Sequence, residues 1–114
     1  DIMQIAASDE TTAITIGTKA TVRLVGARTL VGVRASLTTA QASGSIFTVD
    51  VNKNGTTVLS TKLTIDNTEK TSTTAATAAV ISVSSFADDD EISIDVDQIG
   101  NSTAAGLKVT LLWG

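Results

Sequence analysis

The stretch DDDEISIDVDQIGNSTAAGLKVTLLW, residues 88–113, decides the fold class of this chain. Apolar and polar residues alternate over 92–97 and again over 107–113. A period of two puts successive side chains on opposite faces of an extended chain, which predicts two β-strands with one apolar face each. A short Gly- and Asn-bearing loop separates them, so we expect the two strands to pair as an antiparallel hairpin.

The same alternation recurs along the rest of the chain. It predicts further strands at residues 12–16, 20–25, 29–38, 47–52, 57–60, 62–65 and 79–86. In the strand 29–38 it places Val31, Val33, Ala35 and Leu37 together on the buried face. The segment 68–77 has no apolar periodicity and is expected to be a surface loop.

The composition supports an all-β domain. The 114 residues are rich in Thr, a β-branched residue that favours strands. Apolar residues make up 42% but aromatic residues only 3%, so the core has to be built mainly from Ile, Val, Leu and Ala. About eight strands at regular spacing predict an antiparallel β-sandwich or barrel rather than parallel βαβ units, and we expect the sandwich. We expect residues 1–7 to form an N-terminal arm or edge strand, and residues 8–114 to form a single sandwich domain.

The residue types that are missing limit the chemistry. Without Cys there are no disulfides and no thiolate metal ligands, and without His the common serine hydrolase mechanism is excluded. A net charge of −4 with dispersed Lys and Arg disfavours a nucleic-acid surface, and no apolar run reaches the roughly 20 residues that span a bilayer. We therefore expect a protein that is not an enzyme, has no cofactor, and binds neither nucleic acid nor membrane.

The densest charge cluster is Asp88-Asp89-Asp90-Glu91. Carboxylate oxygens are the ligands that Ca²⁺ and Mg²⁺ prefer, which makes Asp88, Asp89 and Asp90 weak candidates for a metal site. However, consecutive residues of an extended chain cannot all converge on one ion. The favoured interpretation is a solvated turn before a strand, with no bound metal.

A second motif, DVNKNG at residues 50–55, matches the opening of an EF-hand calcium loop. The position of the bidentate Glu is occupied by Thr61, and strand patterns flank the motif where helices are required. Asn54-Gly55 is instead a strong signal for a tight hairpin turn, because both residues tolerate positive φ. The motif therefore predicts a turn.

The N-terminal segment contains Ile2, Met3 and Ile5. An apolar arm of this kind can add a strand to a neighbouring subunit, since an extended segment pairs with an exposed sheet edge. We expect these three residues to bind a partner protein.

Four segments together carry a family resemblance that covers residues 6–114. The chain resembles small β-sandwich proteins and modules encoded among the virion structural genes of tailed bacteriophages. The acidic turn and strand 87–96 are also similar to the "GD-x-I-x-V-x-V" strand of jelly-roll domains, with Asp89 in place of the usual Gly. This similarity implies that the all-β antiparallel sandwich is jelly-roll-like. The four segments are VRASLTTA (33–40), VDVNKNGTTVLSTKLTID (49–66), EKTSTTA (69–75) and ADDDEISIDVDQIG…AGLKVTLLWG (87–114).

The resemblance implies a structural role on the surface of the phage particle. Such modules serve as capsid decoration (cement) proteins, as head fibres or as tail-fibre domains, commonly as trimers, with the major capsid protein or other virion proteins as partners. Glycan binding usually needs exposed aromatic faces, and only two Phe and one Trp are present. We therefore expect a decoration or head-fibre protein. A receptor-binding or adhesin module of a tail fibre is the main alternative, and a bacterial surface adhesin repeat is a third.

Overall fold

The computed structural model describes all 114 residues, Asp1–Gly114. It consists of strands joined by turns and loops, with one short 3-10 turn. The elements are β1 (Ile2–Ala6), β2 (Gly17–Arg23), β3 (Arg28–Ser36), β4 (Phe47–Lys53), β5 (Thr56–Thr57), β6 (Leu59–Thr61), β7 (Leu63–Ile65), η1 (Ser72–Thr74), β8 (Val80–Ile81), β9 (Ser85–Phe86), β10 (Glu91–Gln98) and β11 (Lys108–Trp113).

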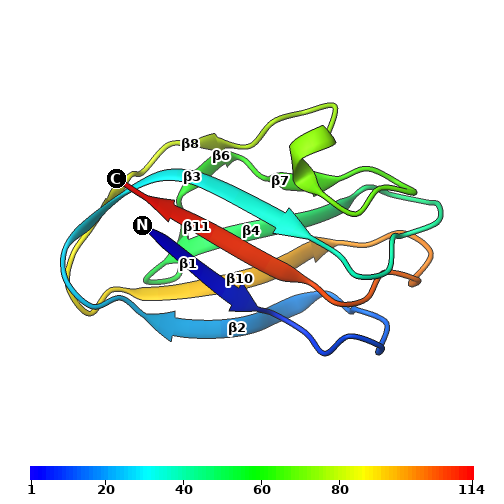
Figure 1. Ribbon diagram of the computed structural model, residues 1–114, viewed down its shortest axis with the longest axis horizontal. Coiled ribbons are helices and arrows are strands. Elements are labelled where there is room, and N and C mark those ends of the chain that lie inside the picture. Colours follow the sequence, from blue (N-terminus) through cyan, green and yellow to red (C-terminus); the bar gives the residue numbers. More distant parts are fainter.

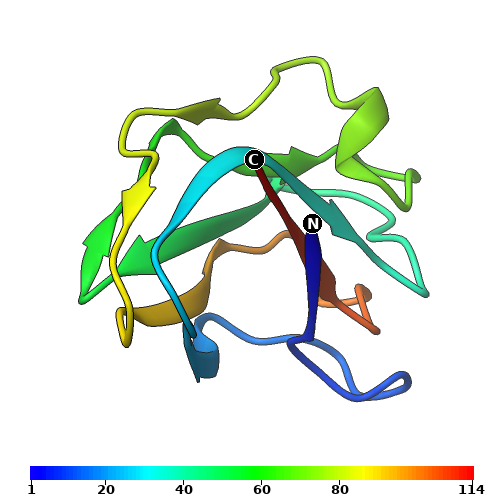
Figure 2. The same cartoon turned by 60° about the vertical axis from the view of Figure 1, so that its left-hand side comes forward.

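The strands form two antiparallel sheets that pack face to face (Figures 1 and 2). One sheet has the order β1-β11-β3-β9, and the other has the order β2-β10-β4-β5 with β7 also paired to β4. β6 and β8 form a separate small ribbon. If β5–β7 count as one strand position and β8–β9 as another, the chain has eight positions in the orders 1-8-3-6 and 2-7-4-5. This is the arrangement of a jelly roll, so the predicted all-β, jelly-roll-like sandwich is confirmed.

The core lies between the two sheets and contains 23 buried apolar residues. β10 and β11 supply alternate side chains to it, as their sequence period requires. The rings of Phe86 and Trp113 meet edge to face at 5.2 Å between centroids, so two of the three large rings pack together. The other strand residues of the core are those of the inner faces: Ile5, Leu30, Ala35, Phe47, Val49, Val51, Leu59, Leu63, Ile65, Ile92, Ile94, Val96, Val109 and Leu111.

The predicted hairpin between β10 and β11 is wrong. β10 pairs with β2 and β4, whereas β11 pairs with β1 and β3, so the two strands lie in opposite sheets. The connecting segment 99–107 crosses the end of the sandwich. There Gln41 accepts a hydrogen bond from the Gly100 N–H at 2.6 Å, and the Ile14 N–H donates to the Ala104 carbonyl at 2.9 Å. The period of two identifies strands and their inner faces, but it does not identify their partners.

The strand predicted at residues 12–16 is also wrong. This segment is a loop, and the strand β2 begins at Gly17. Asp9 organises the start of the loop, because its carboxylate accepts hydrogen bonds from the N–H groups of Thr11 and Thr12. Ile14 still reaches the core from the loop, whereas Ile16 is exposed.

A β-bulge changes the expected inner face of β3. The pairing with β11 skips Val31, since Leu112 lies opposite Gly32 and Trp113 lies opposite Leu30. One extra residue reverses the alternation, so Leu30 is buried and Val31 is 60% exposed. The predicted inner positions Ala35 and Leu37 are buried and Val33 is half-buried, whereas the prediction for Val31 is wrong.

The tight turn at Asn54-Gly55 is confirmed. Both residues have positive φ, 50° and 85°, and they connect the paired strands β4 and β5. The EF-hand-like motif is thus a hairpin, as its turn residues predicted.

Candidate functional site

The candidate metal residues Asp88, Asp89 and Asp90 lie in the turn before β10, and their side chains have separate partners. Asp88 accepts a hydrogen bond from the Gly26 N–H at 2.7 Å. Asp89 has a positive φ of 66° and a carboxylate 3.6 Å from the Arg23 guanidinium. Asp89 thus connects the turn to the end of β2, and Asp88 connects it to the segment after β2.

Asp90 closes the turn and connects it to the β4–β5 hairpin. Its carboxylate accepts hydrogen bonds from the Ala87 N–H at 2.7 Å and from the Asn54 side-chain amide at 2.9 Å. The Asn54 side-chain carbonyl in turn accepts from the Glu91 N–H. The bond from the Ala87 N–H, followed by that from Asn54, holds the pKa of Asp90 below its usual value. These contacts give Asp90 a structural role in joining two turns.

A second acidic group lies on the outer face of the β4–β10 pair. Asp50 and Asp95 are direct cross-strand neighbours, and Lys62 forms ion pairs with Asp50 and Asp97. The Lys62 ammonium is 2.5 Å from Asp97 and 3.8 Å from Asp50. The hydrogen bond to Asp97 is the main reason why the pKa of Lys62 is raised. Lys62 therefore reduces the repulsion between carboxylates that the sheet register places side by side.

Asp50 is the buried member of this group, with only 5% of its surface exposed. Loss of water around the carboxyl raises its pKa, although the hydroxyl of Thr57 donates to it at 2.5 Å and the Val51 N–H donates at 2.9 Å. Asp50 begins the motif that predicted a turn, and that motif gave no sign of its burial. The signal was available in part, since Asp50 and Asp95 both occupy outward positions of strongly alternating strands.

No group of three or more His, Cys, Asp or Glu side chains in the structure has an arrangement that could hold a metal ion. The acidic turn and the Asp50 group are each held by protein donors, as described above. The carboxylates of both groups therefore have a structural role.

The predicted partner-binding residues Ile2, Met3 and Ile5 belong to β1, an edge strand paired along its length with β11. Residues 1–7 thus lie on the sandwich as an edge strand. Ile5 is buried in the core, Met3 packs against the core, and Ile2 is 66% exposed. Of the three side chains, only that of Ile2 is freely accessible to a partner while β1 stays paired.

Ile2 belongs to an apolar strip on the outer face of the β1-β11-β3 sheet. It lies opposite Leu112 on β11, and Leu112 lies opposite Gly32 on β3. A Cβ at Gly32 would approach the Leu112 side chain to 3.1 Å, so Leu112 covers the glycine. Val31, exposed by the bulge, extends the strip to the far edge of β3.

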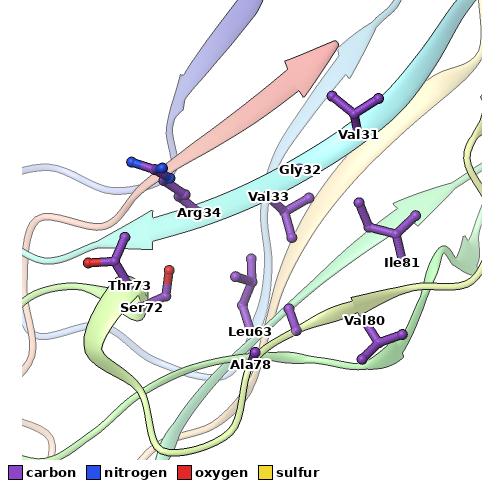
Figure 3. A pocket seen from close by; sticks show the side chains of 11 residues that line it. Val31, Gly32, Val33, Arg34, Leu63, Ser72, Thr73, Ala78, Val80 and Ile81 are labelled. Carbon is purple, nitrogen blue, oxygen red and sulfur yellow. The ribbon is translucent and has the colours of Figure 1, made fainter. Parts of the chain in front are cut away.

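Next to Val31 the surface is hollowed by an open groove of about 520 Å³. Figure 3 shows β3 along one side and the segment 78–81 along the other, with Val33, Leu63 and Ile81 pointing into the space between them. Ser72 and Thr73 of η1 lie at one end, near Arg34 (Figure 3). No sequence pattern predicts this groove, because the groove depends on how far β9 extends along β3.

Comparisons with protein-family models, with curated proteins and with solved structures found no match for this chain. The structure contains no helix with the length and apolar character needed to cross a membrane.

Proposed function

We propose that this protein is a non-enzymatic structural component of a bacteriophage virion, a capsid decoration (cement) or head-fibre protein on the surface of the particle. The proposal is supported by the sequence resemblance over residues 6–114 and by the jelly-roll fold that the resemblance implied. Its partners are the major capsid protein or other virion proteins, and the protein acts as a homotrimer.

The observation that carries this proposal is the exposed apolar surface around the β1-β11-β3 sheet. Ile2 and Val31 are 66% and 60% exposed on this sheet, and Val80 across the groove is 50% exposed. Apolar surface of this kind, when it is contiguous, is typical of a protein–protein contact. A decoration protein needs such a surface, because it is held on the particle by contacts with neighbouring proteins.

The experiment compares binding of fluorescently labelled protein to purified phage particles, to host cells and to a glycan array. We expect binding to particles at a fixed number of copies, with label on the head in electron micrographs. Val31→Asp and Val80→Asp should each weaken this binding, while Val25→Asp, at an 80% exposed position after β2, serves as the matched control. Binding to cells or glycans without binding to heads would contradict the proposal and favour a receptor-binding tail-fibre module.

A further inference from the structure

The groove lies along a part of β3 that has no strand beside it. β11 pairs with β3 from Leu30 to Ser36 on one side, but β9 covers only Arg28 and Thr29 on the other. Just beyond β9, the Leu30 N–H donates to the Ser84 carbonyl at 2.8 Å. The next bridge on that side joins Ser36 and Thr71. No strand pairs with β3 on this side over residues 31–34, which lie along the groove.

The open edge directs main-chain groups toward the groove. The Ala35 N–H points to this side, where it donates to the Ser72 hydroxyl at 2.9 Å, and the Leu37 N–H donates to the Lys70 carbonyl at 2.8 Å. In an antiparallel sheet every second residue presents its N–H and C=O to the same side. Val33 therefore presents its N–H and C=O to the groove, where a strand of another protein can pair with them.

The side chains at this edge differ between its two faces. On the inner face, Val33 with Leu63 and Ile81 makes an apolar lining. On the outer face lies Arg34, the single charged residue among the eleven that line the groove. An added strand alternates between the same two faces, so it would place one residue against Val33 and the next beside Arg34.

Arg34 is also electrostatically unusual in this acidic protein. Its side chain makes no hydrogen bond and no ion pair, and Lys70, close to the same end of β3, makes none either. The other six basic side chains each have a partner. Four form ion pairs with carboxylates: Arg23, Arg28, Lys62 and Lys108. Lys53 contacts the Ser85 carbonyl and the Phe86 ring, and Lys19 donates to the Thr15 hydroxyl. An exposed, unpaired Arg in a chain of net charge −4 favours an acidic partner residue at this position.

We propose that the open edge of β3 accepts an extended segment of a partner protein as an added strand. The segment carries an apolar residue that enters the groove against Val33 and, next to it, an Asp or Glu that pairs with Arg34. Main-chain hydrogen bonds to Val33 provide the affinity, and the Arg34 pair selects the acidic sequence. This inference rests on the proposed function, because the partner that supplies the added strand would be a neighbouring virion protein.

The test uses a short capped peptide of sequence TVTVEVT and its counterpart TVTVKVT, titrated into ¹⁵N-labelled protein. We expect shifts in the amide spectrum confined to residues 31–34 and 78–81, with the Glu peptide bound about fivefold more tightly than the Lys peptide. Arg34→Glu should reverse this preference. Lys19→Glu, the same charge change on β2 in the other sheet, should leave it unchanged.

The main-chain part of the proposal has its own control. A TVTVEVT peptide N-methylated at the amides that face β3 should lose binding, because it cannot donate to the Val33 carbonyl. Any of three results would overturn the proposal. The first is no shift in the amide spectrum at millimolar peptide, and the second is shifts elsewhere on the surface. The third is equal binding of the N-methylated and unmethylated peptides. Concentration-dependent shifts at residues 31–34 without peptide would also overturn it, by assigning the groove to a second copy of the chain.

This outcome is separable from that of the particle-binding experiment. If the protein binds phage heads but not the peptide, strand addition at β3 is wrong and the proposed function still holds. If the protein binds the peptide but not phage heads, the proposed function is wrong and strand addition at β3 still holds.

Discussion

β4 and β3 occupy the same position in their respective sheets, third from the β2 edge and third from the β1 edge, yet only β4 has strands along both sides. β10 pairs with β4 on one side, and β5 and β7 together pair with it on the other. β3 has β11 on one side and only the short β9 on the other. Both strands have similar alternating sequences, so the difference comes from the connections rather than from the strands themselves.

This difference separates what stabilises the fold from what is available for binding. The inner residues of β4 are fully buried, and its outer face holds the hydrogen-bonded Asp50 group. β3 has a bulge at Val31, an open edge and a groove beside it. We expect substitutions on β4 to act on the free energy of unfolding, and substitutions of the exposed residues of β3 to act on binding.

The largest effect is expected from a matched pair of substitutions. Val51→Asp places a carboxylate at a position with no exposed surface, which costs several kcal/mol, comparable with the whole stability of a small domain. Val31→Asp changes a side chain that is 60% exposed and should leave the fold intact. Circular dichroism and thermal melts check both variants. A folded Val51→Asp protein would mean that β4 is less tightly enclosed than the structure indicates.

A smaller effect is expected where a side chain, in place of a strand, completes β3. Ser72→Ala removes the hydroxyl that accepts from the Ala35 N–H, which should cost about 1 kcal/mol of unfolding free energy. Hydrogen exchange at Ala35 should speed up at the same time. Thr73→Ala is the control, because the Thr73 hydroxyl contacts only Thr71. Equal stability of the two variants would show that Ser72 does not close this edge.

The sequence predicted most of the strands and most of their inner faces, because alternation is a local property. The strand predicted at 12–16 is a loop, and the one predicted at 79–86 is the two short strands β8 and β9. Phe47, Ile94 and Val109 are buried as their positions in the pattern require. It did not predict partners, since the pairing of β10 with β4 depends on the path of the loops rather than on the strand. Nor could it predict the bulge at Val31 or the length of β9, which together create the open edge and the groove.

Asp50 on β4 should make the free energy of unfolding depend on pH, by an amount on the order of 1 kcal/mol or less. Because burial raises its pKa in the folded protein, its contribution is fully present below the unfolded value of 3.8 and is lost as the pH rises through the folded pKa. Asp50→Asn should therefore be more stable than the parent at pH 7 and equal to it at pH 3. Urea unfolding at both pH values measures this. A variant that is less stable at pH 7 would show that the carboxylate is net stabilising there.

The smallest effect is expected in the acidic turn, with the opposite sign. The pKa of Asp90 is lowered, so its contribution is present above the unfolded value of 3.8 and is lost as the pH falls through the folded pKa. Asp90→Asn should reduce the loss of stability on acidification below pH 4. Asp89→Asn, at an exposed side chain, should change little. The structural role of this turn would be contradicted if added Ca²⁺ strongly stabilised the parent protein and Asp89→Asn abolished that stabilisation.

The open edge of β3 is tested most directly by amide hydrogen exchange at Val33, with Val49 on β4 as the internal reference. Val49 has a paired strand on each side, whereas the groove side of Val33 has none. We expect the Val33 amide to exchange at least about a hundredfold faster than that of Val49 in the free protein, and to become protected when the Glu peptide is bound. Equal protection of the two amides in the free protein would contradict an open edge on β3.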